Sequence, residues 1–423
     1  MRHATSQLER PAHAPLATNV GPGAAADVRG SGRGRCGRRR GFTLIELLTV
    51  VSIILLLTAV TIPLAVPALA GRQKREAARE LNSFIVGARS RARQTGRPVG
   101  IWLERYRDPA NAMNVLDEMC LNVYYAEVPR PYAGDYVDSR IALVITGTDG
   151  SGRPLYEAQF FRTNPDGSSA TRWIRSADSG LTGRLRIGDQ IRVGNKGPKY
   201  TIIDAANQAQ GVITSLVDIV VVDDLGQPML ETNVARDGSG NPARDSSGNL
   251  IPLPPVPFQF FLSPTKSAAS PLQMPGDVVI DLNYSGEDGA LPFVVRNDGS
   301  NNGFTGNPVY VGDTTPVVIT FAPNGAIDRV YRSNTLGGGP PVLTGFTPQG
   351  AVHLLLGERE RVPASDDQSR NNWHELSNYW VSIQPQTGMI TTAEVYPTDE
   401  VDPNFGVPMS RTFAREGQSM GGR

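Results

Sequence analysis

The sequence predicts an α+β fold, in which one long N-terminal helix packs on an antiparallel β-sheet head that carries a large β-rich insertion. An apolar segment near the N-terminus runs directly into a segment with helical periodicity. Most of the remaining chain consists of short alternating or apolar runs bounded by Gly, Pro, Asn and Asp. With 45 glycines, 33 prolines and only 19% charged residues, a mainly helical body is excluded.

Residues 1–41 form a basic leader that is rich in Ala, Gly, Pro and Arg and lacks hydrophobic periodicity. The whole chain is neutral, with 41 basic and 41 acidic residues, so no nucleic-acid partner is predicted. The leader nevertheless contains the block RGSGRGRCGRRR at residues 29–40, which favours a cytoplasmic N-terminus. Arg72, Lys74 and Arg75 lie beyond the apolar segment and weaken this contrast in charge.

Residues 42–62 read FTLIELLTVVSIILLLTAVTI and are apolar except for small hydroxyl residues and one carboxylate, Glu46. This is about the length of one membrane span at 1.5 Å rise per residue, so residues 42–70 are predicted to be the transmembrane half of the helix. Pro63 and Pro67 are expected to kink the helix or end it. A carboxylate within such a helix is costly, so Glu46 requires either a function or a place at the headgroup boundary.

Residues 71–97 are predicted to be the amphipathic half of the helix. Apolar side chains recur at three- and four-residue spacing, which is typical of one buried helix face. These are Ala77, Ala78, Leu81, Phe84, Ile85, Ala88 and Ala92, while Arg79, Glu80, Arg89, Arg91 and Arg93 are predicted to face away from them. Gly96 and Pro98 are predicted to end the helix.

Residues 98–396 are predicted to form the β-rich head, and residues 397–423, which have few apolar clusters, a flexible tail. The expected strands are residues 99–104, 121–128, 141–146, 155–161, 190–193, 200–204, 216–222, 258–262, 278–282, 316–322, 352–356 and 379–384, followed by a turn and a final strand within 386–395.

The stretch RRRGFTLIELLTVV, residues 38–51, resembles the type III signal of prepilins and type II secretion pseudopilins. It has their small residue, Phe, hydroxyl, two aliphatics, Glu and unbroken apolar run. The resemblance implies cleavage by the prepilin peptidase after Gly41 and a new N-terminus, usually N-methylated, at Phe42. It also implies that Glu46 pairs with the terminal amine of a neighbouring subunit and that Pro63 bends the helix. The implied partners are this peptidase, other pilins or pseudopilins, the inner-membrane assembly platform and the membrane itself through residues 42–62.

The later segments resemble the H-type minor pseudopilins and the fimbrial T-type minor pilins. Residues 77–103 are similar to the helix and first strand of that domain, and VVITFAPNGAI (317–327) and QTGMITTAEV (386–395) to its Phe-x-Pro-x-Gly turn and terminal Thr-Gly hairpin. The resemblance is poor over 104–275, where we expect an enlarged insertion that includes a small β-meander at 180–222.

This resemblance implies a structural subunit of a type II secretion pseudopilus or a type IV pilus. Such a subunit is a single-pass protein of the bacterial inner membrane, with its N-terminus in the cytoplasm and its head in the periplasm. It is then incorporated into a filament. The bulk of the head favours a tip or initiating position in that filament.

An ordinary export signal is the alternative interpretation of the N-terminus. Residues 39–42 (RRGF) are similar to a twin-arginine motif, and residues 68–70 (ALA) to a cleavage site. Cleavage after Ala70 would release residues 71–423 as a soluble periplasmic binding module. Glu46 argues against this, and so does an apolar run longer than the usual signal core of about 7–15 residues.

The sequence predicts no enzyme. His3 and His13 lie in the leader, which leaves His353 in an apolar run and His374 beside Trp373. The sequence contains no H-E-x-x-H, no G-x-S-x-G and no paired cysteine spacing. Both remaining histidines are therefore interpreted as structural.

No cofactor or small-molecule ligand is predicted. The two cysteines, Cys36 and Cys120, form no disulfide framework, since Cys36 lies in the leader. Calcium is the alternative, because the major pseudopilins that the N-terminal motif resembles use it and because residues 237–249 and 297–302 are rich in Asp and Asn, which supply oxygen ligands. Neither stretch has the EF-hand spacing, and Asp-Gly-Ser-Gly is turn chemistry, so no metal ligands are assigned.

Overall fold

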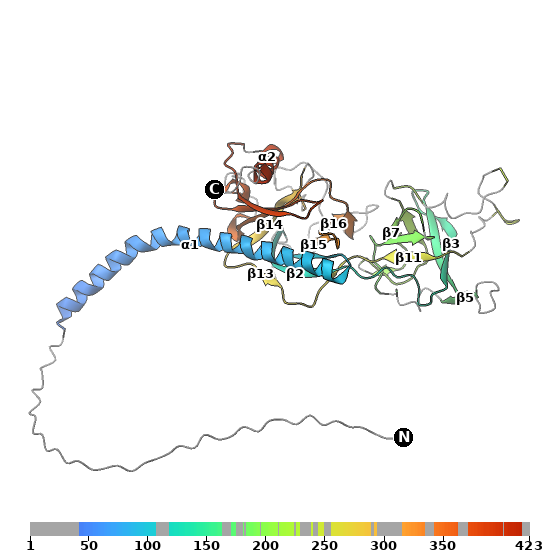
Figure 1. Cartoon of the computed structure of the whole chain (residues 1–423), viewed down its shortest axis with the longest axis horizontal. Helices are drawn as coiled ribbons and strands as arrows, with labels where there is room; N and C mark the ends of the chain where they lie inside the picture. The colour runs from blue at the N-terminus through green and yellow to red at the C-terminus, as the bar shows by residue number, and fades with distance from the viewer. Residues whose placement is uncertain are drawn as a thin grey trace, which may run out of the picture. The chain divides into compact units, whose positions relative to one another are not determined.

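The computed structural model describes the chain from Phe42 to Glu416 with gaps, and the fold is α+β as predicted (Figure 1). The described residues are 42–106, 118–162, 171–174, 181, 183–194, 196–209, 211–223, 226–228, 238–239, 244–248, 255–288, 292–293, 315–334, 342–362, 371–400 and 402–416, without the side chains of 60–70, 162, 171–174 and 209. The chain divides into two units, Met1–Ile62 and Pro63–Arg423.

Helix α1 spans Leu44–Thr95 and contributes to both units. The helix continues through Pro63 and Pro67, so the structure excludes the expectation that these prolines end it. A proline removes one helical hydrogen bond, and a long helix that continues on both sides of the proline can accommodate this loss. The helix ends at Thr95 as predicted, because Gly96 has a φ of 64° and takes the left-handed conformation that closes a helix.

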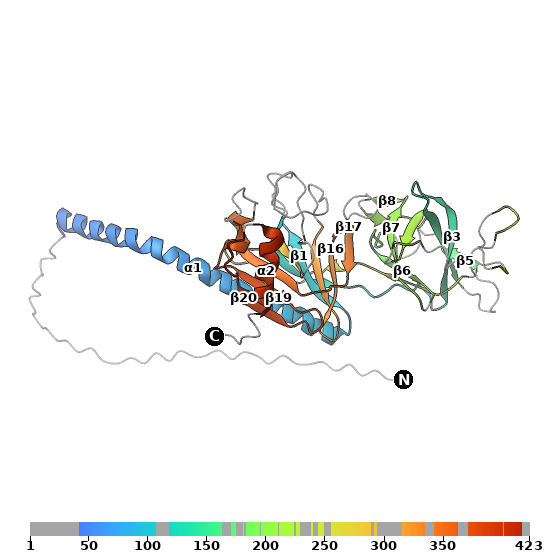
Figure 2. The same ribbon diagram turned by 90° about the horizontal axis from the view of Figure 1, so that it is seen from above.

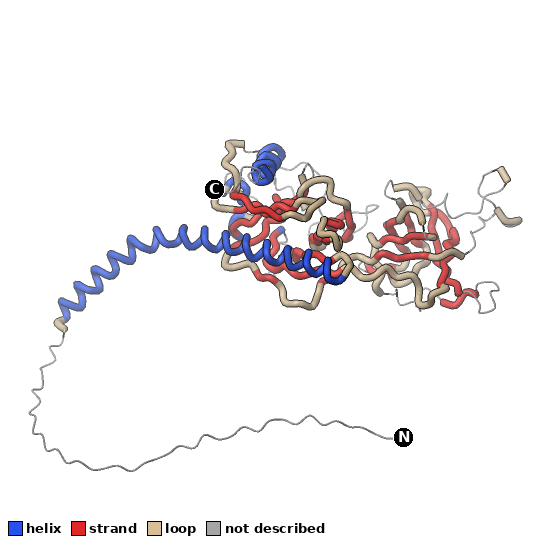
Figure 3. Tube along the Cα trace, in the orientation of Figure 1, coloured by secondary structure: helices blue, strands red, loops and turns tan. Residues whose placement is uncertain are grey.

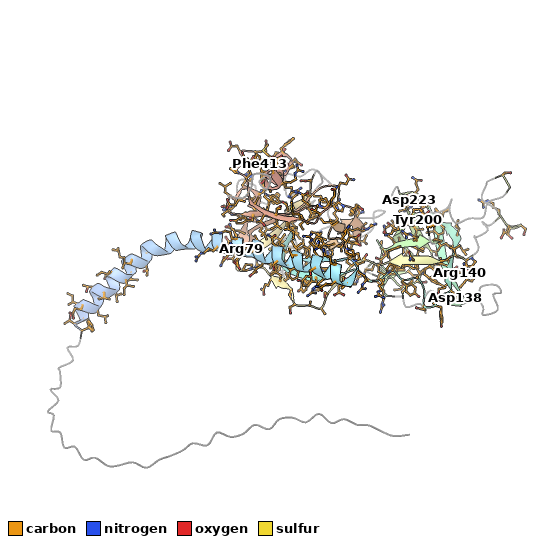
Figure 4. The ribbon with its side chains drawn as sticks, viewed as in Figure 1. Arg79, Asp138, Arg140, Tyr200, Asp223 and Phe413 are labelled. Carbon is orange, nitrogen blue, oxygen red and sulfur yellow. The ribbon has the colours of Figure 1, made fainter. Side chains whose placement is uncertain are left out.

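The amphipathic half of α1 packs on a β-sheet through the predicted stripe. Ala77, Ala78, Leu81, Ile85, Ala88 and Ala92 are all buried. Phe84 stacks on Tyr125 with 4.0 Å between ring centroids, and the Arg91 guanidinium lies 3.8 Å from the centroid of the Tyr125 ring. The outward side chains include Arg79, which Figure 4 labels on α1. The stripe therefore joins the helix to the head.

Sheet A has eleven strands in the order β17-β16-β15-β1-β2-β14-β18-β19-β20, with β12 and β13 also paired to β2. Strands are the main regular elements of the head (Figure 3). The bounds are β1 Val99–Arg105, β2 Met119–Glu127, β12 Thr265–Lys266, β13 Leu272–Gln273, β14 Val278–Glu287, β15 Val317–Phe321, β16 Ile327–Asn334, β17 Val342–Phe346, β18 Val352–Glu358, β19 Tyr379–Ile383 and β20 Ile390–Glu394. The main core lies between α1 and this sheet.

Sheet B has seven strands in the order β11-β6-β7-β10-β4-β3, with β5 paired to β4, and it encloses a core of its own. The bounds are β3 Ser139–Thr148, β4 Pro154–Arg162, β5 Thr171–Ile174, β6 Gln190–Val193, β7 Tyr200–Ala205, β10 Ile219–Val222 and β11 Phe258–Phe261, with β8 Gln208–Ala209 and β9 Val212–Ile213 forming a separate pair. The predicted meander is present as β6, β7 and β10, and it forms the middle of this larger sheet.

The predicted insertion, residues 104–275, is too wide at both ends. β2 lies between β1 and β14 in the middle of sheet A, and Cys120 and Val123 are fully buried in the core against α1. Strands β12 and β13 also belong to sheet A. Sheet B is therefore confined to residues between Tyr132, which bridges to Phe260, and β11.

The two turns singled out by sequence resemblance lie against each other. Gly325 and Gly388 both have positive φ, 93° and 61°. A Cβ atom on Gly388 would lie 2.0 Å from the Gly325 carbonyl oxygen, so only glycine fits there. Arg89 of α1 donates from Nη2 to the Thr387 carbonyl oxygen at 2.9 Å. The C-terminal part of the helix, the β15–β16 turn and the β19–β20 turn are thus joined.

The prediction that residues 397–423 form a flexible tail is wrong for helix α2, Pro403–Glu416 (Figure 2). Val407, Ser410, Arg411 and Ala414 are buried at helical spacing against β19 and β20. The Trp380 indole donates to Ser410 Oγ at 2.9 Å, and the Arg411 guanidinium donates to the backbone carbonyls of Glu287 and Tyr284 at 2.9 and 2.6 Å. These buried contacts hold the helix on the sheet.

Candidate assembly site at the N-terminus

The described chain begins with a reciprocal cap at the start of α1. Thr43 stands before the first helical residue, and its carbonyl oxygen accepts the bond from the Leu47 N–H at 3.2 Å. The Glu46 N–H donates to Thr43 Oγ1 at 3.3 Å. In return, Glu46 Oε2 accepts from the Thr43 N–H at 2.9 Å and from the Thr43 hydroxyl at 3.0 Å. This is a capping box, which satisfies backbone donors that an open helix end leaves unpaired.

Glu46 therefore has a structural function within its own chain, in addition to the intersubunit function that resemblance implies. The sequence already indicates this capping box, because Thr43 and Glu46 have the T-x-x-E spacing ahead of an apolar run. Sequence reasoning missed it by treating Glu46 only as a misplaced charge. Within the described residues only Oε2 is hydrogen-bonded, so Oε1 is left to accept from another group.

The helix that follows this cap is apolar on every side. Between Glu46 and Arg72 the sequence contains no charged residue. The large apolar side chains are exposed, from Phe42 at 84% and Leu44 at 83% to Leu57 at 57%. A helix that is apolar all round is stable only where lipid or protein covers it. The first unit therefore presents a surface for an apolar environment outside this chain.

Two of the predicted site residues are only partly described or not described at all. Gly41, and with it the predicted cleavage point, lies outside the described residues. Pro63 is helical in its backbone, but its side chain lies outside them. The predicted span, residues 42–62, likewise extends beyond Ala59, the last residue before the gap in described side chains.

No helix within the residues that the structure describes is long and apolar enough to cross a membrane.

The charged residues that follow the apolar stretch are not equivalent. Arg72 and Arg75 are exposed, whereas Lys74 is 1% exposed and donates from Nζ to Glu358 Oε1 and Ser377 Oγ, both at 2.7 Å. Burial alone would raise the pKa of the Glu358 carboxyl, but the hydrogen bonds and charges of Lys74 and Arg361 outweigh it and hold this pKa below its usual value. The charge of Lys74 is therefore balanced by Glu358 within the head.

His353 joins two strands of sheet A through a buried polar contact. Its Nδ1 lies 2.8 Å from Ser382 Oγ, and its Nε2 lies 2.8 Å from Asp288 Oδ1. Burial lowers the pKa of His353, and the hydrogen bond to Asp288 opposes this shift. The residue types match a catalytic triad, but His353 and Ser382 are 0% and 1% exposed. A substrate therefore has no access to this serine. The two contacts instead give His353 a structural role, because they link β18 to Ser382 of β19 and to Asp288.

The calcium hypothesis falls mostly outside the described residues. Residues 297–302 lie entirely outside them, and of 237–249 only 238–239 and 244–248 are described. Where the structure does place side chains, no group of three or more His, Cys, Asp or Glu is arranged to hold a metal ion. Trp373 and Trp380 are fully buried.

Comparison with known proteins bears on the N-terminal segment. The family described as the prokaryotic N-terminal methylation motif matches residues 36–62, which include Gly41, Phe42 and Glu46. No curated protein and no solved structure is significantly similar to the chain. The match therefore covers the capped apolar helix, and the head is described from the structure alone.

Proposed function

We propose that this type IV pilin-like protein is a minor pseudopilin-like, non-enzymatic structural subunit of a type II secretion pseudopilus or a type IV pilus. The single observation that carries the proposal is the motif segment itself. It starts an uncovered apolar helix with a capping box whose glutamate keeps one oxygen available. The prepilin peptidase and other pilins are the partners that the motif implies.

Glu46 supplies the specific contact in this proposal. Cleavage after Gly41 creates an α-amine at Phe42, and a filament buries that amine among apolar helices. A cation and a carboxylate that are buried together offset a desolvation cost that neither bears alone. Glu46 Oε2 remains in the cap of its own helix, while Oε1 accepts from the amine of a neighbouring subunit. The pairing sets the register between subunits.

The two halves of α1 have separate functions in this assembly. The first half moves from the bacterial inner membrane, where lipid covers it, into the filament, where neighbouring helices cover it. The second half remains packed on sheet A through its buried stripe. Resemblance to the H-type and T-type minor subunits at this stripe and at the two joined turns supports the finer assignment.

The size of the head favours a tip or initiating position. Sheet B adds a second core to a head that sheet A and α1 already complete. A subunit of that bulk packs poorly in a repeatedly stacked shaft. Quantifying the subunits of purified filaments tests this point, and finding the chain as the most abundant shaft subunit would contradict it.

Mass spectrometry of the mature N-terminus tests the proposal most directly. In cells with the prepilin peptidase we expect a chain that begins at an N-methylated Phe42, and in cells without it the uncleaved chain. An Ala70→Leu variant is the matched control, because it blocks a signal peptidase site without touching residues 36–62. A wild-type chain that begins at Gly71, and an Ala70→Leu chain that is no longer cleaved, would establish the soluble alternative. That alternative requires cleavage inside α1, since Ala70 is helical.

A further inference from the structure

A pocket of about 250 Å³ lies where the insertion joins sheet A. Its walls come from the loop after α1, the chain that leaves β2, strands β6 and β11 of sheet B with Lys199 just before β7, and strands β16 and β17 of sheet A. Ligand pockets typically occupy about 300–1,000 Å³ and occur at such junctions. At about 250 Å³ the pocket lies just below this range, so it suits only a small organic molecule.

The junction is held at two places, so the pocket has a defined shape. On one side, Glu127 at the end of β2 pairs with Thr265 of β12, next to where the chain leaves and re-enters sheet A. On the other side, Val342 of β17 is buried in the core of sheet B. Gly188 has a φ of 96°, and a Cβ there would lie 2.6 Å from the Leu343 carbonyl oxygen. The walls are preorganised, which lowers the entropic cost of binding.

The lining is strongly cationic within a neutral protein. Arg97, Arg130, Lys199 and Arg329 line the pocket, and Asp328 is the one carboxylate among the lining residues. Burial raises the pKa of Asp328, and the charges of Arg329 and Lys199 oppose this shift. An excess of fixed cations around a partly desolvated space attracts an anion.

A second nearby carboxylate is already occupied. Asp189 is fully buried behind the lining, and its oxygens accept from the backbone N–H groups of Arg186 and Ser263, both at 2.7 Å. The Ser263 hydroxyl also donates to it. These bonds hold two loops together, and Asp189 is not among the residues that line the pocket.

The cations are positioned by aromatic and backbone groups. The Lys199 ammonium lies 4.0 Å from the centroid of the Phe261 ring, and Phe261 and Tyr331 both line the pocket. Arg329 donates from Nη1 to the Gly345 carbonyl oxygen at 3.3 Å, which uses one of its five donors. The remaining donors suit a carboxylate or a phosphate, and the rings suit an apolar group attached to it.

From this size, charge and lining we propose that the pocket binds a small organic anion, a carboxylate or phosphate attached to a compact apolar group. Arg130 and Arg329 pair with the anionic end, and Phe261 and Tyr331 contact the apolar end. The site lies in the head and does not depend on the filament function.

Isothermal titration of the full-length chain in detergent micelles tests the proposal with three probes of similar size: benzoate, phenyl phosphate and uncharged benzyl alcohol. We expect at least one anion to bind and benzyl alcohol to bind at least about tenfold more weakly. Arg329→Gln and Arg130→Gln are each expected to weaken binding of the anion about tenfold. The relative affinities of the two anions identify the acidic group.

Arg192→Gln is the matched control, because Arg192 also lies over the Phe261 ring, at 5.3 Å, but does not line the pocket. It makes the same Arg-to-Gln change as Arg329→Gln and is expected to leave affinity for the anion unchanged. Equal weakening in all three variants would reveal a diffuse charge effect and overturn the site. So would equal binding of benzyl alcohol, or no binding of any probe to the folded wild-type chain.

Discussion

The two halves of helix α1 differ in what covers them. From Leu44 to Ala59 the apolar side chains are exposed on every side, whereas from Ala77 to Ala92 they form one stripe that is fully buried against sheet A. The first half therefore contributes little to the stability of its own chain, and the second half contributes much. One continuous helix thus has an apolar first half that the rest of the chain leaves uncovered and a second half whose apolar stripe is buried against sheet A.

The comparison extends to the charged residues of each half. Glu46 is exposed, and among the described residues its carboxylate is bonded only to Thr43, three residues away. Lys74 is buried and bonded to Glu358 and Ser377, which lie 284 and 303 positions away. We infer that substitutions in the first half change assembly, and that substitutions in the second half change folding.

The largest expected effect is the loss of assembly in Glu46→Gln. Glutamine preserves the capping box but removes the negative charge, so the helix still starts at the same residue. We expect membrane insertion to be unchanged and incorporation into filaments to fall at least about tenfold, as for the loss of a buried ion pair. Quantitative immunoblotting of sheared filaments against the membrane fraction measures both.

Thr43→Val is the matched control for this variant. It removes the hydroxyl of the cap, at a cost of about 1 kcal/mol to the helix start, and keeps the Glu46 charge. We expect its incorporation to remain within about twofold of the wild type. If Thr43→Val were as defective as Glu46→Gln, the cap and not the charge would direct assembly.

The next largest effect separates the two halves by stability. Leu81→Ala removes a fully buried side chain from the core between α1 and sheet A, and we expect a loss of about 3 kcal/mol in the free energy of unfolding. Leu48→Ala removes the same atoms from an exposed position and is expected to cost less than about 0.5 kcal/mol. Denaturant titration of the full chain in micelles, followed by tryptophan fluorescence, compares them. Equal losses would contradict the division of the helix.

A smaller effect is expected for Lys74→Met, which keeps the volume of the buried stem but removes the ammonium group. Removing one partner of a fully buried ion pair typically costs about 3–5 kcal/mol. Glu358 is 35% exposed and retains Arg361 at 3.0 Å, so solvent and Arg361 compensate for part of the loss. We therefore expect about 1–2 kcal/mol in the same unfolding assay. Unchanged stability would mean that the pair only positions the helix.

Local patterns predicted helix α1 and most of the longer strands, but not β16, β17 or α2. The stripe that includes Leu81, the stop at Gly96 and the positions of the main strands depend on spacing within ten or so residues. The order of strands in sheet A was not predictable, because β1 pairs with β15, more than two hundred residues away. The limits of the insertion were misjudged for the same reason, since nothing local shows that β2 belongs to sheet A.

Helix α2 and the cap show two different reasons for failure. Gly406 and Pro408 interrupt the sequence of α2, and this concealed the helical spacing of Val407, Ser410 and Arg411. At the cap, Thr43 and Glu46 have the T-x-x-E spacing of a capping box. This local signal was overlooked because the same residues also match a processing motif. The junction pocket required tertiary structure, because its basic residues lie on segments far apart in the chain.

The smallest expected effect is the pH dependence of the Lys74–Glu358 pair. The folded chain holds the pKa of Glu358 below 4.5, its ordinary value, so the unfolded chain takes up the proton first as pH falls. The contribution of the pair is complete above this value and disappears as pH falls through the folded pKa. In Lys74→Met the folded-state pKa of Glu358 is lowered less, so the variant loses less stability as the pH falls. The difference in free energy of unfolding between wild type and variant is therefore expected to narrow between about pH 6 and pH 3, by less than about 1 kcal/mol. The comparison of the two proteins cancels the titration of other carboxyl groups. A constant gap would assign the contribution of Lys74 to its hydrogen bond with Ser377 and to packing, and not to the charge of Glu358.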